Sequence, residues 1–405
     1  MSHPAQLRLA TVPCTVGLLL AMACPAQIGG DGRDGALEPV ADLVLDTSTR
    51  PGGVFQFTRI TIPAGVTLRL VGDEPAVLRS QGAVDVAGTI DADGFAAVDA
   101  LGGEGGPGGA AGGHGGPWGS VFCAEAGQGN GGGGAGCVQP FSVPQSGGPA
   151  GHATPGQQGL GSGGGRAYGS AYPFDLEGGS GAGGTAYPSS FGQLGPGGGG
   201  GGGVVAILAD EAVVVSGTVR VRGADLGSAG SVLLRSLASV RVHGLIDAGG
   251  NSGGPPPLFP RSGDGFVRLD AYGDAPTVTG TVRGVVVTRT LPELTALAAP
   301  RLGAPWSLTS ATVPGDQVVL LAAAATASVA LPRFGVLRLD PSAGLLIVAS
   351  ATTATAGIDP LAELSLAIPP LSALIGSTLH VQAINAVTAT GRPRLTNLVS
   401  GTIGT

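Results

Sequence analysis

One unit of sequence occurs four times in this chain, and this repetition limits the folds that the chain can adopt. Each copy contains an apolar segment, a break, a V-x-V-like segment, one glycine and a second short segment. The copies are Ala76–Gly94, Val205–Gly223, Gly230–Gly254 and Phe266–Gly284. A repeat of about 20–30 residues cannot bury its own apolar face, so neighbouring copies must stack. The repeat therefore predicts stacked coils of β-strands, as in a parallel β-helix.

Apolar and polar residues alternate within each copy. In the third copy, one parity holds Val240, Val242, Ile246 and Ala248, and the other holds Arg241, His243 and Asp247. This alternation predicts strands with one buried and one exposed face. Because the copies align on their glycines, we expect three valines to point into one shared interior, namely Val86, Val215 and Val242.

The chain is predicted to be all-β, with a short right-handed parallel β-helix that carries a long Gly-rich insertion, followed by a C-terminal antiparallel β-sandwich. Short alternating segments separated by turns indicate the sandwich. Two alternating strands in Phe55–Val71 are expected to cap the first coil. The predicted divisions are 1–27 (signal peptide), 28–94 (N-terminal cap and first coil), 95–203 (Gly-rich insertion), 204–290 (remaining coils) and 291–405 (sandwich).

Residues 1–27 have the features of a secretory signal peptide. Arg8 precedes an apolar segment, Thr15–Ala23, and small residues follow it. A lipid anchor at Cys24 and a buried helix are the alternatives. No other segment approaches the roughly 20 apolar residues of a membrane span, so we expect no transmembrane segment in the mature chain. We therefore expect a protein that is secreted or held at the cell surface.

The charge of the chain argues against two classes of partner. The net charge is −7, charged residues make up 12% of the chain, and all basic residues are arginines. A chain without a basic cluster is a poor candidate for binding nucleic acid or anionic membranes.

The segment 95–203 holds 42 of the 77 glycines. Glycine pairs recur in 102–116, GGEGGPGGAAGGHGG, with a spacing of three residues that is broken once. Three residues per turn is the period of the polyproline II helix. Either this insertion is disordered, or its glycine faces let several extended helices pack closely. We expect it to leave the β-helix between Gly94 and Val204, and its removal to leave the β-helix folded.

Two cysteines, Cys123 and Cys137, lie beyond the predicted signal peptide. In an oxidising compartment they are expected to form a disulfide that closes a loop of about 15 residues, worth about 3 kcal/mol in the chain-entropy model. Free thiols are one alternative. A metal site with His114 or His152 is another, although the spacing is not compact.

Three carboxylates near a predicted coil corner, Asp91, Asp93 and Asp99, provide hard oxygen ligands of the kind that Ca²⁺ prefers. The alternative is that aspartates before glycine form turns; Asp225, Asp247 and Asp264 follow strands in the same way. No other cofactor is expected.

Two further patterns leave their roles open. Arg79 and Arg235 occupy equivalent repeat positions, so they either stack on one outer face or are solvated. Gly113-His114-Gly115 matches a triplet of β-helix polygalacturonases, but those enzymes need paired aspartates, and the sequence has no Asp-Asp pair.

Several segments resemble known exported proteins. The segments ITIPAGVTLRL and AVDVAGTIDADG and the glycine-pair tract resemble exported, Gly-rich parallel β-helix surface proteins over residues 55–289. The segments FGVLRLDPSAGLLIV, GSTLHVQAINA and RLTNLVSGTI resemble a C-terminal β-sandwich domain on exported proteins of planctomycete-type bacteria. The resemblance implies architecture and location, and it carries no activity.

These observations favour a non-catalytic structural or adhesive protein of the cell surface, whose partners would be polysaccharide or other surface proteins. One alternative is a carbohydrate-active β-helix enzyme, a polysaccharide lyase or hydrolase, on fold analogy alone. The other is a carbohydrate-binding module, in which aromatic residues between 118 and 191 stack on sugars.

Overall fold

The computed structural model describes residues 28–116, 123–138, 143–158, 162–188, 193–251, 260–353, 359–386 and 393–405. The predicted signal peptide, with Cys14 and Cys24, lies outside these ranges. Within them, no helix has the length and apolar character needed to cross a membrane.

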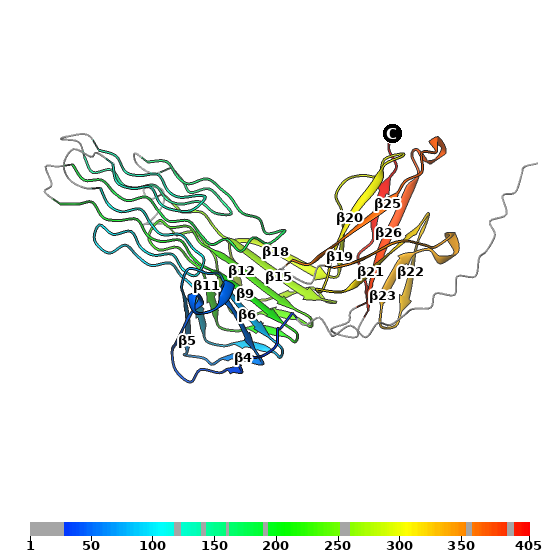
Figure 1. The fold of residues 1–405 in the computed structure, drawn as a ribbon, viewed down its shortest axis with the longest axis horizontal. Helices are drawn as coiled ribbons and strands as arrows, with labels where there is room; N and C mark the ends of the chain where they lie inside the picture. Colours follow the sequence, from blue (N-terminus) through cyan, green and yellow to red (C-terminus); the bar gives the residue numbers. More distant parts are fainter. Residues whose placement is uncertain are drawn as a thin grey trace, which may run out of the picture.

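The N-terminal part is a parallel β-helix with three sheets of six strands each (Figure 1). Successive strands along the chain go to sheets A, B and C in turn, so each coil adds one strand to every sheet. Sheet A comprises β1 (Ala36–Leu37), β4 (Arg59–Ile62), β7 (Val84–Val86), β10 (Val213–Val215), β13 (Val240–Val242) and β16 (Thr277–Val278). Sheet B comprises β2 (Leu43–Asp46), β5 (Thr67–Val71), β8 (Thr89–Asp91), β11 (Thr218–Arg220), β14 (Leu245–Asp247) and β17 (Thr281–Arg283). Sheet C comprises β3 (Val54–Phe57), β6 (Ala76–Ser80), β9 (Val204–Ala209), β12 (Ser231–Ser236), β15 (Phe266–Tyr272) and β18 (Val285–Leu291).

The repeats stack in the register that the sequence predicts. Val215 pairs with Val86 on one side and with Val242 on the other, in parallel strands. All three side chains are fully buried in one apolar cluster that runs along the β-helix. The prediction of a shared interior is therefore confirmed.

The segment Phe55–Val71 forms a coil of its own, so the predicted cap is wrong. It holds most of β3 together with β4 and β5, which pair in parallel with the first repeat. Ile60 and Ile62 are fully buried and align with Val84 and Val86. The alternation that suggested a cover continues the interior of the β-helix instead.

The Gly-rich insertion leaves the β-helix between two neighbouring coils. The strands β8 and β9 are consecutive along the chain, and the coil before the insertion, β6 to β8, pairs in parallel with β9 to β11. The first two repeat copies are therefore adjacent coils, as predicted. Figure 1 shows the insertion extending to one side of the β-helix and the C-terminal domain standing on the other.

The C-terminal domain is built from antiparallel sheets, as predicted. One sheet has β20 (Pro305–Ala311) between β19 (Glu293–Ala296) and β25 (Leu361–Ala367). The other comprises β24 (Leu346–Thr352), β21 (Gln317–Ala323), β26 (Thr378–Ala386), β27 (Arg394–Leu395) and β28 (Val399–Thr402). A hairpin of β22 (Thr326–Leu331) and β23 (Gly335–Leu339) completes the domain. Buried residues of both larger sheets share one core around Trp306.

The interior register can be tested on β13. Val242 is fully buried, whereas the next residue towards the N-terminus, Arg241, is exposed. We expect Val242→Asp to lower the free energy of unfolding by about 3–5 kcal/mol, because an unpaired carboxylate would lie among aliphatic side chains. The control is Arg241→Asp, which should change it by less than about 1 kcal/mol. Equal effects in chemical denaturation would contradict the register.

Candidate functional site

The described part of the Gly-rich region forms a bundle of extended segments, which we call threads. The central thread is 178–187. Every third residue of this thread exchanges backbone hydrogen bonds with the same two neighbours: Gly179, Ala182 and Thr185 accept from 110–116 and donate to 196–202. The period of three residues agrees with the polyproline II helix expected from the glycine pairs.

The two other faces of the central thread have neighbours as well. Gly181 and Gly184 donate to 125–128 and accept from 133–136. Gly183 donates to Gly148, and Ser180 bonds Ser228. The central thread is thus surrounded, and its backbone groups find partners on other threads rather than within the thread. Of the two alternatives that the sequence left open, the packed arrangement is the one that the described residues adopt.

Close approach of the threads requires glycine at specific positions. A Cβ on Gly183 would overlap the carbonyl oxygen of Gly134, and one on Gly181 would overlap that of Ala111. The same substitution at Gly163, on the exposed side of the bundle, would meet no atom within 4 Å. Backbone packing, rather than flexibility, therefore explains the composition of this region.

Corners of the β-helix join the bundle. Gly202 donates to the carbonyl of Ser228, and Gly263 donates to that of Ala150. The segments around 228 and 263 connect strands of sheet C to the preceding coil, so they belong to the β-helix and to the bundle at once. Removal of 95–203 with an intact β-helix remains a prediction, but these contacts argue against it.

The Gly-rich region also covers apolar residues on the outer face of sheet C. Phe174 packs there in a buried cluster whose β-helix members are Val77, Val204, Ala206, Leu208, Leu233 and Phe266. The ring of Tyr172 lies 4.0 Å from the guanidinium carbon of Arg289. Two of the aromatic residues that suggested sugar stacking therefore hold the region to the β-helix. Four others, Trp118, Phe122, Phe141 and Phe191, lie outside the described residues.

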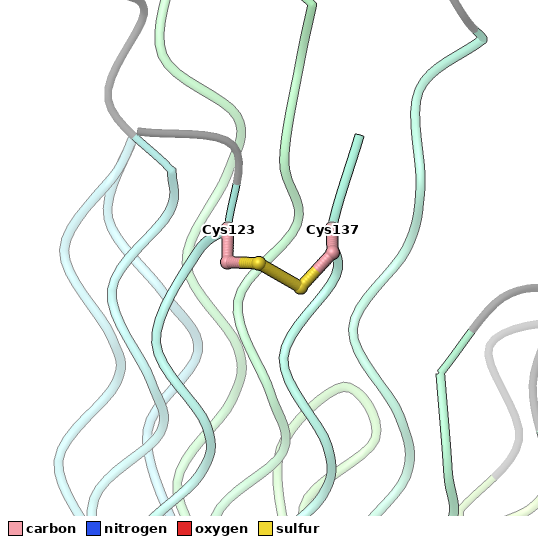
Figure 2. The surroundings of a disulfide bond; sticks show 2 residues. All are labelled: Cys123 and Cys137. Carbon is pink, nitrogen blue, oxygen red and sulfur yellow. A yellow bond between two sulfur atoms is a disulfide. The ribbon is translucent and has the colours of Figure 1, made fainter. Parts of the chain in front are cut away.

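Cys123 and Cys137 form a disulfide, as predicted, with their Cα atoms 4.0 Å apart. Figure 2 shows the bond joining two neighbouring threads. Next to it, the amide of Ala124 donates to the carbonyl of Gly136. The bond therefore fixes the register of two threads that already pair through their backbones.

Neither histidine considered with the cysteines adopts a metal-binding arrangement. His152 is buried between Tyr168 and Phe266, and one ring nitrogen, Nδ1, lies 2.7 Å from the carbonyl oxygen of Ala229. Burial lowers the pKa of His152 to about 4, so the ring is neutral at pH 7. His114 accepts a hydrogen bond from the amide of Gly102 within the bundle.

The predicted calcium ligands Asp91 and Asp93 lie at the end of β8, where both bind arginine. Asp91 lies 2.6 Å from Arg69 and 2.8 Å from Arg220, and Asp93 lies 2.7 Å from Arg222. Asp91 also accepts the amide of Asp93, which is the turn geometry of the alternative interpretation. The calcium site remains a prediction, and these contacts favour the turn.

Asp99 takes no part in this arrangement as a third acid. Its backbone is left-handed, with φ of 53°, and its carbonyl accepts the amide of Gly197 in the bundle. No group of three or more His, Cys, Asp or Glu with a geometry suited to a metal ion occurs in the part of the chain that the structure describes.

The ion pairs of Asp91 belong to a ladder of alternating charge on sheet B. Register positions in five successive coils hold Arg69, Asp91, Arg220, Asp247 and Arg283. From the sequence, Asp91 and Asp247 could be recognised as residues that follow strands, but the arginines opposite them could not. The signal exists only between copies, because each partner lies in a neighbouring coil. We call these five residues the charge ladder.

The ionisation of Asp91 limits what the charge ladder can do chemically. Burial alone would raise the pKa of Asp91, but hydrogen bonds from Arg220 and Arg69 outweigh burial and lower the pKa to about 2. Asp91 is therefore ionised at neutral pH and cannot serve as a general acid, while its low basicity makes it a poor general base. Glycosidases need one carboxyl group that is still protonated. The charge ladder is suited to holding coils together.

A second charged group, the junction cluster, joins the C-terminal domain to the β-helix. It consists of Arg235, Arg268, Asp270 and Asp359, all at most 8% exposed in their side chains. Asp359 of the C-terminal domain lies 2.6 Å from Arg235 and 2.5 Å from Arg268. Arg235 is thus buried, and the prediction that it is solvated is wrong.

The junction cluster also touches the Gly-rich region. The amide of Phe174 donates to Asp359, and Arg268 donates to the carbonyl of Ala171. Burial alone would raise the pKa of Asp359, but Arg235 and Arg268 lower the pKa to about 2. The sequence alone does not reveal this role of Asp359, because its partners are distant in the chain.

No family model matches the chain, and no curated protein or solved structure matches it either. The arrangement of the threads, the charge ladder and the junction cluster is therefore the basis on which a function can be proposed.

The packing of the threads can be tested with a pair of alanine substitutions. We expect Gly183→Ala to lower the free energy of unfolding by about 1–3 kcal/mol, because the Cβ of the new alanine would overlap the backbone of Gly134. Gly163→Ala should leave it unchanged or raise it by about 0.5 kcal/mol through a lower entropy of the unfolded chain. Thermal unfolding with a spectroscopic readout gives both values. Equal losses would show that glycine acts through its flexibility instead.

The junction cluster can be tested at Asp359. Asp359→Ala should lower the free energy of unfolding by about 3–5 kcal/mol, because Arg235 and Arg268 would then share Asp270 alone and one buried positive charge would lack a counter-ion. The exposed Glu363→Ala, in the same domain, has the same charge change and should have little effect.

Acid should weaken the same cluster. The pKa of Asp359 in the folded protein, about 2, lies below the ordinary value of 3.8. The contribution of Asp359 to the free energy of unfolding is therefore complete above about pH 4, and it is lost as the pH falls towards 2. The Asp359→Ala variant should lack this part of the acid dependence.

Proposed function

We propose that this protein is a secreted or surface-located structural or adhesive protein without catalytic activity. The observation that carries the proposal is the bundle: the described parts of 95–203 form closely packed threads that extend away from the β-helix (Figure 1). Backbone hydrogen bonds and a disulfide hold the threads in register. Such a bundle presents a rigid, extended surface.

Export supports the same proposal. Residues 1–27 have the pattern of a signal peptide, and an oxidising compartment favours the Cys123–Cys137 bond. The resemblance to exported, Gly-rich β-helix surface proteins of planctomycete-type bacteria agrees with this location. Polysaccharide or other surface proteins are the partners that the proposal implies.

The carbohydrate-active alternative depends on the carboxylates of sheet B. Asp91, Asp93 and Asp247 do gather with arginines on one face, which is where a β-helix enzyme would bind a polysaccharide. Each of these carboxylates accepts hydrogen bonds or faces a guanidinium. The alternation of charge supports a structural role over a catalytic one.

One experiment tests location and activity together. The full chain, expressed in a bacterial host, should be recovered in the exported fraction with a mass that shows cleavage near residue 23 or 26. The exported protein, incubated with a panel of polysaccharides, should release no new reducing ends and no unsaturated products.

Release of sugar products would contradict the proposal if the Asp91→Asn variant no longer released them while the Arg241→Gln variant still did. Retention of the chain in the cytoplasm with residues 1–27 attached would contradict the location.

A further inference from the structure

A pocket lies between the last coil of the β-helix and the C-terminal domain. Its volume is about 730 Å³, within the range of small-molecule sites. The edge strand β18 and Gly273 form one wall, and β23 and β27 form the other. The pocket is distant in the chain from the threads and from the charge ladder.

Positive charge dominates the pocket. Arg289, Arg338 and Arg394 line it together with one acid, Glu293, which already pairs with Arg289 at 2.5 Å. This excess is notable in a chain of net charge −7. It leaves two guanidinium groups in the pocket, those of Arg338 and Arg394, without an acid on the pocket wall.

Arg338 and Arg394 have no carboxylate partner elsewhere. Every Asp and Glu of the chain falls within the described ranges, and none of them lies within 4.0 Å of either guanidinium group. In addition, Nε of Arg394 is buried without a hydrogen-bond acceptor among the described residues. A buried donor without an acceptor is costly, so an external acceptor would stabilise this side chain.

The backbone at Gly273 is shaped around Arg394. Gly273 has φ of +89°, and a Cβ there would lie 3.0 Å from the guanidinium carbon of Arg394. A larger residue would therefore displace the guanidinium group. The arginine is held against the corner that follows β15, rather than extended into solvent.

We infer that this pocket binds an acidic saccharide, through a carboxylate or sulfate group of a sugar unit held by Arg338 and Arg394. The guanidinium group presents paired donors that match a carboxylate or sulfate. The remaining lining suits a sugar ring, because the exposed Thr288 and Thr290 offer hydroxyls and Phe334 offers an apolar ring. The inference goes beyond the proposed function, because this pocket is separate from the bundle.

Binding can be measured by calorimetry with the folded, mature protein. The probes are trigalacturonate, its methyl ester, a sulfated disaccharide, a neutral disaccharide and sodium sulfate alone. We expect trigalacturonate or the sulfated disaccharide to bind, and which of them binds identifies the acidic group. The methyl ester and the neutral sugar should bind at least 10-fold more weakly.

Substitutions then place the ligand. Arg338→Gln, at an exposed position that should not disturb folding, and Arg394→Gln should each weaken binding at least 10-fold. Arg241→Gln, on sheet A, should leave binding unchanged. The inference is overturned if no acidic saccharide binds, if the Arg338 variant binds like wild type, or if sodium sulfate alone binds as tightly as the saccharide. None of these outcomes bears on whether the bundle is adhesive.

Discussion

Hydrogen bonding between backbones that are distant in sequence is the constraint on which this structure depends. In the β-helix, parallel strands of successive coils exchange these bonds, and side chains alternate between the interior and the surface. In the bundle, the backbone groups of the central thread bond to neighbours on three sides, so a buried thread has little room for side chains. The first arrangement selects valine and isoleucine, and the second selects glycine.

Ion pairs contribute differently in the charge ladder and in the junction cluster. In the charge ladder, partly exposed arginines alternate with buried aspartates of neighbouring coils, so ion pairing favours one stacking register and offsets the desolvation of the aspartates. In the junction cluster, the groups are buried, and the balance of two arginines and two aspartates offsets the cost of desolvation. Such buried pairs add little net stability, but they penalise any other placement of the C-terminal domain.

The β-helix and the sandwich could be predicted from the sequence because their signals are local. Valines at the same place in the first three copies define the interior, and alternation defines each strand. The partners of a thread could not be predicted, since every glycine is equally able to pack against any other. The partners of Asp91 and Asp359 were missed for a related reason: Arg220 and Arg235 are more than 100 residues away. The pocket arginines carry no motif: Arg338 and Arg394 come from separate strands of the C-terminal domain, and Arg289 comes from the last strand of the β-helix.

The position of the insertion has a consequence for how the chain folds. The strands β8 and β11 pair directly, yet an insertion of about 110 residues lies between β8 and β9 in the chain. Closing a loop of that length costs about 4 kcal/mol of chain entropy before the pairing can offset it. The connections within the coils from β9 to β18 are at most 18 residues long, so these coils can nucleate by themselves. The coils before the insertion, although synthesised first, would then fold onto the coils after it, which form first. The ordering of the threads would bring these two parts of the β-helix together.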